Sequence, residues 1–153
     1  MKRAIFIRVK AFVELNFLTQ LIGKMNIPES KTNNSPTILI VDDDDINQRL
    51  IFYHLRGITD KMLFAANGRE AINVYSENPD VCLILMDLVM PIMNGVEASN
   101  KIHEINPNVK IIALSAFREE ENEYGSGETK FTGYLTKPVR KEVLIETVKK
   151  YLD

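Results

Sequence analysis

Residues 37–45 read TILIVDDDD, a short apolar run that leads directly into four aspartates. The run is rich in β-branched residues and shows no alternation of polar and apolar positions. This pattern is typical of a strand that is buried on both faces, as in a parallel sheet. Ligands of open α/β sheets bind just beyond the carboxyl ends of the strands. We therefore expect Asp42 and Asp43 to lie at a functional edge.

Strand and helix patterns alternate along the rest of the chain. Further strands are predicted at 61–66, 82–86, 109–114 and 133–136. The first helix is predicted from the periodic residues Ile46, Leu50, Ile51, His54 and Leu55, and later helices at 68–77, 95–105 and 141–152. Strands that alternate with helices form a parallel sheet with helices on both faces. The sequence thus predicts a doubly wound α/β domain with five strands.

Polar residues follow the other strands that lead to the predicted edge. Asp87 comes directly after LILM (83–86), Ser115 after the fourth strand and Lys137 after the fifth. Three carboxylates, a hydroxyl and an ammonium group are therefore expected to converge. Carboxylates packed this closely repel one another unless a cation lies among them. An all-oxygen ligand set of this kind suits Mg²⁺.

Composition limits the class of protein. A length of 153 residues corresponds to one domain with room for a tail. The single cysteine, Cys82, cannot form an internal disulfide, so nothing indicates an oxidising compartment and we expect a cytoplasmic location. A net charge of −2 argues against a nucleic-acid partner. Uncharged runs are far shorter than the roughly 18 residues of a membrane span, so no membrane insertion is predicted.

The net charge changes sign near residue 36. Residues 1–36 hold six basic and two acidic side chains, whereas residues 37–153 hold 13 basic and 19 acidic ones. The change coincides with IPESKTNNSP, whose Pro, Ser and Asn content is typical of a linker. We predict an N-terminal extension at 1–26, a linker at 27–36 and the α/β domain at 37–153.

Apolar residues of the extension repeat at helical spacing, which favours a helix there. The residues are Ala11, Leu15, Leu18, Ile22 and Met25. Three interpretations stay open: a tail helix, a short dimerisation helix or a basic surface anchor. The oligomeric state is not predicted.

Four motifs together resemble the receiver domains of two-component response regulators, most closely those of hybrid histidine kinases. They are ILIVDDDDIN (38–47), LILMDLVMPIMNG (83–95), IIALSA (111–116) and GYLTKP (133–138). The resemblance implies a flavodoxin-like sheet with strand order 2-1-3-4-5. It also implies a phospho-accepting signalling domain of a phosphorelay, served by a histidine kinase or a histidine phosphotransfer protein. Such a domain is not an enzyme beyond its own phosphorylation and dephosphorylation.

The resemblance implies a role for each residue at the predicted edge. Asp87 corresponds to the phospho-acceptor, and Lys137 to the lysine that pairs with a phosphoryl oxygen. Ser115 and Tyr134 correspond to the hydroxyl and the aromatic residue that switch position on phosphorylation. Pro138 implies a cis Lys–Pro bond. The implied cofactor is Mg²⁺, with these ligands: Asp42 through water, Asp43, Asp87 and the backbone carbonyl of Val89.

Two other classes of protein stay open. Consecutive aspartates after a strand also satisfy the Asp-x-Asp signature of haloacid-dehalogenase-type, Mg²⁺-dependent phosphatases. Those enzymes need a second acidic pair at a later strand end, and none follows Lys137. A pseudo-receiver, which binds partners without being phosphorylated, is the other class. The complete set of acids, hydroxyl and lysine argues against it.

Residues 117–133 depart from the family pattern. The family places an amphipathic helix here, but FREEENEYGSGETKFTG has few apolar residues and a Gly-Ser-Gly interruption. Such a segment cannot form a good core-facing stripe. We expect a short or frayed helix.

Overall fold

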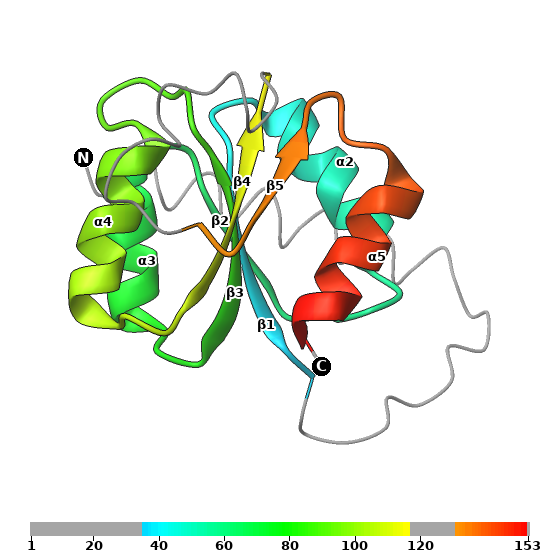
Figure 1. The fold of residues 1–153 in the computed structure, drawn as a ribbon, viewed down its shortest axis with the longest axis horizontal. Coiled ribbons are helices and arrows are strands. Elements are labelled where there is room, and N and C mark those ends of the chain that lie inside the picture. The colour runs from blue at the N-terminus through cyan, green and yellow to red at the C-terminus, as the bar shows by residue number, and fades with distance from the viewer. Residues whose placement is uncertain (1–34, 117–130, 153) are drawn as a thin grey trace, which may run out of the picture. The chain divides into compact units, whose positions relative to one another are not determined.

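The computed structural model describes residues 35–116 and 131–152, and in these ranges five parallel strands alternate with four helices (Figure 1). The strands are β1 (Thr37–Val41), β2 (Met62–Ala65), β3 (Val81–Asp87), β4 (Lys110–Ser115) and β5 (Gly133–Thr136). The helices are α2 (Asp45–Leu55), α3 (Gly68–Glu77), α4 (Gly95–Ile105) and α5 (Lys141–Leu152). The strand order is β2-β1-β3-β4-β5, which confirms the predicted doubly wound sheet.

Successive residues of the central strands face opposite layers of the molecule. Leu39 and Val41 belong to the hydrophobic cluster beneath α3 and α4, whereas Ile38 and Ile40 belong to the cluster beneath α2 and α5. Figure 1 shows the two helix pairs on opposite faces of the sheet. Because both faces are covered, a strand such as β1 needs apolar residues at every position.

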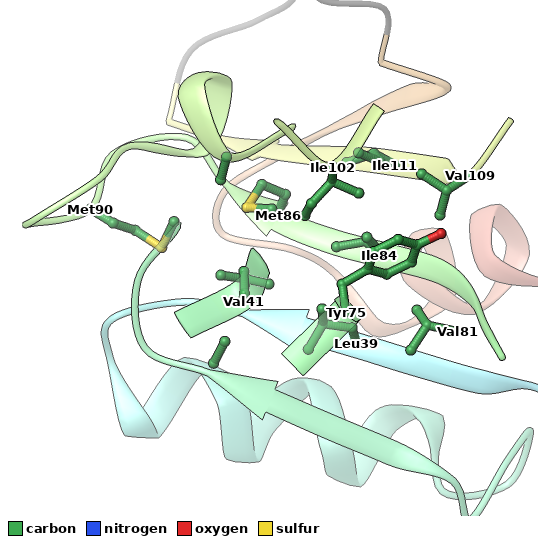
Figure 2. Close-up of a cluster of buried hydrophobic side chains, with 13 residues drawn as sticks. Leu39, Val41, Tyr75, Val81, Ile84, Met86, Met90, Ile102, Val109 and Ile111 are labelled. Carbon is green, nitrogen blue, oxygen red and sulfur yellow. The ribbon is translucent and has the colours of Figure 1, made fainter. Parts of the chain in front are cut away.

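The cluster beneath α3 and α4 shows how the helices are held. Tyr75 from α3 and Ile102 from α4 pack with Leu39 and Ile84 of the sheet (Figure 2). Each of these side chains is buried. Burial of one such apolar side chain contributes about 1.5–3 kcal/mol. The two helices are therefore fixed against the sheet, and the loops that join β2 to α3 and β3 to α4 are anchored at both ends.

Side-chain caps begin the helices that follow β1, β2 and β3. Asp44 accepts from the Ile46 N–H at the start of α2, and Asn67 and Asn94 do the same for α3 and α4. Each cap satisfies a backbone donor that has no partner inside the helix. The chain therefore turns immediately after β1, and the acidic residues stay in the short connection between strand and helix.

The periodic residues expected in the first helix do not all face the sheet. Ile51 and Leu55 are buried, but Ile46 is 74% and Leu50 48% exposed. The helix was predicted correctly, whereas its buried face is narrower than the apolar pattern indicates. The N-terminal extension, most of the linker and the expected helix within 117–130 lie outside the described residues. No helix in the described ranges is long and apolar enough to cross a membrane.

Candidate functional site

The carboxyl ends of β1 and β3 bring three aspartates together. Asp42 and Asp43 follow β1 directly, and Asp87 is the last residue of β3. One carboxylate oxygen from each residue lies within 4.8 Å of the others. Asp42 and Asp87 are buried and Asp43 is exposed, so the cluster opens to solvent on one side. The predicted convergence of the three acids is what the structure shows.

Lys137 lies between the two buried carboxylates. Its Nζ is 2.8 Å from Asp42 Oδ2 and 2.8 Å from Asp87 Oδ2. Its backbone N–H donates to the Ser115 carbonyl over 2.7 Å, which ties the residue to the end of β4. The Lys137–Pro138 peptide bond is cis, as predicted. One ammonium group thus partly neutralises two carboxylates.

Both oxygens of the fully buried Asp42 carboxylate have hydrogen-bond partners. Oδ1 accepts from the Asp44 N–H at 2.9 Å and from Asn47 Nδ2 at 3.2 Å. Oδ2 accepts from Lys137. A buried charge is tolerated only when it is paired and hydrogen-bonded in this way. Asp42 is therefore held rigidly in one orientation.

The loop after Asp87 passes very close to its own strand. A Cβ at Gly95 would lie 2.1 Å from the Asp87 carbonyl oxygen, so only glycine fits there. The Gly95 N–H donates to the Leu88 carbonyl at 3.0 Å, and the Val89 N–H donates to Asp87 Oδ1 at 3.2 Å. These contacts explain why the position eight residues after Asp87, the last of the MNG sequence (93–95), is a glycine.

Ser115 and Tyr134 lie on the neighbouring strands. Ser115 ends β4, is buried and pairs in register with Thr136 of β5, next to Lys137. Tyr134 is partly buried, and its ring makes an edge-to-face contact with Phe131 at a centroid distance of 5.4 Å. Strand pairing therefore places the hydroxyl near the acidic cluster and the aromatic residue two positions before Thr136.

The sequence model of the response regulator receiver domain matches residues 38–149. This chain belongs to the receiver family. The receiver is 38% identical over 121 residues to the autoinducer 1 sensor kinase/phosphatase LuxN of Vibrio campbellii, which is 79% of this chain but 14% of LuxN. It is 33% identical over 112 residues to the chemotaxis protein CheY of Halobacterium salinarum, 72% of this chain and 92% of CheY.

A solved structure also resembles the receiver. It is a chain of the co-crystal of the Saccharomyces cerevisiae histidine phosphotransfer signaling protein Ypd1 and the receiver domain of its downstream response regulator Ssk1. The TM-score is 0.70 at 29% identity, and the match covers 79% of this chain and 91% of that chain. The chain spans a small part of LuxN but nearly the whole of CheY, so only the receiver itself is shared with both. The phosphatase class considered above is not favoured.

Two polar residues of the receiver's site were not predicted. Asn47 donates to the Asp42 carboxylate, and Gln48 Nε2 donates to the carbonyls of Asp42 at 2.6 Å and Ala65 at 3.0 Å. Both residues precede the buried Ile51, by four and three positions, so both point inward on α2. Polar side chains on the inward stripe of a helix were the signal that could have revealed them.

Burial and neighbouring charges shift the pKa values of Asp87 and Lys137 for different reasons. Burial raises the pKa of the Asp87 carboxyl, and the nearby Asp42 charge adds to this, although the hydrogen bond and charge of Lys137 oppose it. Burial alone would lower the pKa of Lys137, but its bonds to Asp42 and Asp87 outweigh burial and raise that pKa. Lys137 therefore stays charged at neutral pH, whereas burial makes ionisation of Asp87 less favourable than in water.

Proposed function

We propose that this receiver accepts a phosphoryl group on Asp87 from a phosphohistidine donor. The observation that carries the proposal is the position of the Asp87 carboxylate. It lies at the carboxyl edge of the sheet, with two further carboxylates within 4.8 Å and the Lys137 ammonium 2.8 Å away. An acceptor needs a nucleophilic oxygen and nearby positive charge for the incoming phosphoryl oxygens, and this site supplies both.

In the proposed step, an Asp87 oxygen attacks phosphorus and forms a new phosphorus–oxygen bond. The phosphorus–nitrogen bond breaks, and its electron pair returns to the imidazole ring of the donor histidine. The product is an acyl phosphate on Asp87. Lys137 donates hydrogen bonds to the phosphoryl oxygens, since its ammonium already adjoins the acceptor oxygen. The receiver thus promotes its own phosphorylation and acts on no other substrate.

The three carboxylates fit a Mg²⁺ ion, which prefers oxygen ligands and keeps several of its waters. We assign Asp43, Asp87 and the Val89 carbonyl as direct ligands. Asp42 fits a water-mediated role, because its carboxylate is fully buried and already accepts three hydrogen bonds, whereas the Asp87 carboxylate accepts two. When bound, the ion supplies positive charge beside the phosphoryl oxygens. Without the ion, the buried carboxylates of Asp42 and Asp87 are both paired with the Lys137 ammonium.

The proposed signal leaves the site through Ser115 and Tyr134. The buried Ser115 hydroxyl can donate to a phosphoryl oxygen on Asp87, because β3 and β4 are neighbouring strands with Asp87 opposite Leu114. Movement of Ser115 changes the space available to Tyr134, one strand further along the sheet. The surface around β4 and β5 is therefore the part we expect to change.

The partner class is a histidine kinase or a histidine phosphotransfer protein. LuxN is a sensor kinase/phosphatase, and the Ssk1 receiver was crystallised with a histidine phosphotransfer protein. Apolar side chains are also exposed beside the acidic cluster. Ile46 follows Asp43 by three residues, and Val89 follows Asp87 by two. Exposed apolar groups beside an acidic site favour a protein donor over a free metabolite.

Intact-mass measurement tests the proposal. After incubation with Mg²⁺ and acetyl phosphate, the receiver should gain one labile phosphoryl group, and Asp87→Asn should gain none. A phosphorylated histidine phosphotransfer protein should lose its label to the wild type alone. Steady release of phosphate without an adduct would instead indicate a phosphatase, and the absence of any reaction would indicate a pseudo-receiver.

A further inference from the structure

One side-chain amide of α2 holds the backbone of the acidic pair. Gln48 Nε2 donates to the Asp42 carbonyl at 2.6 Å and to the Ala65 carbonyl at 3.0 Å. Both hydrogens of one nitrogen are therefore used, and they join the ends of β1 and β2. Gln48 is half-buried, so water competes only weakly for these bonds.

The bond to Ala65 is not needed to pair the two strands. The Asp42 N–H already donates to the Ala65 carbonyl at 3.1 Å, which continues the β1–β2 ladder. Gln48 adds a second donor to that oxygen. Its distinctive contact is the shorter bond to the Asp42 carbonyl, an oxygen beyond the end of β1.

The Asp42 carbonyl belongs to the peptide unit that leads into Asp43. Because a peptide unit is planar, a hydrogen bond to its oxygen fixes the direction in which the Asp43 Cα lies. Within the described residues no hydrogen bond or ion pair orients the exposed Asp43 side chain. Asp42 is oriented by its own side-chain bonds, whereas Asp43 depends on its backbone.

We propose that Gln48 is a positioning residue for Mg²⁺ binding. By holding the Asp42–Asp43 peptide unit, it sets the separation of the Asp43 and Asp87 carboxylates before the ion arrives. The inference rests on the proposed function, in which Asp43 is a direct ligand. Groups that orient metal ligands typically affect metal affinity by about 10–100-fold when they are removed. Gln48 acts through a peptide unit, so we expect the lower end of that range.

The test compares Gln48→Met with Thr37→Val in the full chain. Methionine keeps the length and helix propensity of glutamine but has no donor. Thr37→Val removes the 2.7 Å hydrogen bond from Thr37 Oγ1 to Asp80 Oδ2 at the opposite end of β1. Mg²⁺ affinity is measured by calorimetry, thermal stability in EDTA, and the rate of phosphorylation by acetyl phosphate as Mg²⁺ is varied.

Gln48→Met should weaken Mg²⁺ binding about tenfold. Its phosphorylation rate should approach that of the wild type at saturating Mg²⁺. Thr37→Val should lower Tm by about 2–4 °C, as expected for one lost hydrogen bond in a chain of this length, with Mg²⁺ affinity unchanged. Gln48→Asn, whose amide is too short to reach both carbonyls, should behave like Gln48→Met and covers the case in which methionine prevents folding.

Two results would overturn the positioning role. One is wild-type Mg²⁺ affinity in both Gln48 variants, which would leave only a structural role. The other is an equal loss of affinity in Thr37→Val, which would trace the effect to general destabilisation. A wild type that neither binds Mg²⁺ nor reacts with acetyl phosphate would instead refute the proposed function, and the inference with it.

Discussion

Asp87 combines burial with a like charge nearby, and both raise the pKa of its carboxyl above the ordinary value of 3.8. An acid with a raised pKa is protonated more easily in the folded state than in the unfolded state. Its contribution to the free energy of unfolding therefore falls as pH rises from the ordinary value through the raised one. Ionisation of Asp87 therefore lowers the free energy of unfolding of the metal-free receiver at neutral pH.

Asp87→Asn should consequently be more stable than the wild type at neutral pH in EDTA, by a few degrees in Tm. The neutral amide removes the charge whose burial disfavours folding. Replacement of a functional residue often stabilises a protein in this way. The difference should shrink as pH falls toward the ordinary carboxyl pKa. Thermal unfolding across this pH range measures it. A less stable variant at neutral pH would show that the Lys137 ion pair outweighs burial.

Lys137→Met should destabilise the metal-free receiver, because Asp42 and Asp87 lose their shared cation. We expect a loss on the order of 2 kcal/mol, below the value for a fully buried pair because Lys137 is partly exposed. Mg²⁺ should bind this variant more tightly, since no ammonium competes for the carboxylates. Lys149→Met, which removes an exposed lysine of α5, is the control for both measurements.

We expect Val89 to affect how long the proposed phosphoryl group on Asp87 lasts. Its N–H bonds to Asp87 Oδ1, its side chain is 64% exposed, and an apolar side chain cannot orient a water molecule. Val89→Asn should therefore speed loss of the phosphoryl group, by up to about 10²-fold for one oriented group. The decay of the phosphorylated mass at fixed Mg²⁺ measures this. Equal lifetimes in both proteins would show that hydrolysis is limited elsewhere.

At the scale of elements, the loop from β3 to α4 contains an unfavourable residue. Ile92 has a φ of 72° and is 75% exposed. A β-branched residue in the left-handed region costs about 1–3 kcal/mol, and an exposed isoleucine recovers little of this by burial. Such strain occurs where a loop must keep one shape, and this loop follows the acceptor candidate Asp87 and contains the ligand candidate Val89.

Ile92→Asn should stabilise the receiver by about 1 kcal/mol, since asparagine tolerates the left-handed region. The matched control is Ile105→Asn, which replaces another exposed isoleucine at the end of α4. Denaturant unfolding compares the two variants. An equal gain in both would mean that loss of exposed apolar surface, and not relief of strain, accounts for the change.

The elements could be predicted because each one has a local signal. Continuous apolar runs mark the strands buried on both faces, and the acids, hydroxyl and lysine directly follow strand ends. The inward position of Gln48 on α2 had a local signal, but its partners did not, because they are backbone carbonyls and one of them lies 17 residues away. The exposure of Ile46 had a similar cause. Which side of α2 faces the sheet depends on α5, a distant element that packs beside it.

At the scale of the whole molecule, the charge change near residue 36 predicts that the domain begins at residue 37, and one hydrogen bond argues for a slightly earlier start. Pro36 is also part of the domain, because its carbonyl accepts from Thr59 Oγ1 at 2.6 Å. A boundary placed after Pro36 would remove that bond and leave a buried hydroxyl without its acceptor.

We therefore predict that residues 35–153 fold and are phosphorylated without residues 1–34. Tm should lie within a few degrees of the full chain, and Asp87 should react with acetyl phosphate at the same rate. A start at residue 37 is the sharper comparison. It should cost about 1–2 kcal/mol through the lost Thr59 bond, with the rate unchanged, because that bond lies at the opposite end of β1 from Asp42. If removal of residues 1–34 alone lowered Tm as much, the extension would be part of the folded unit, and the domain boundary would have to move toward the N-terminus.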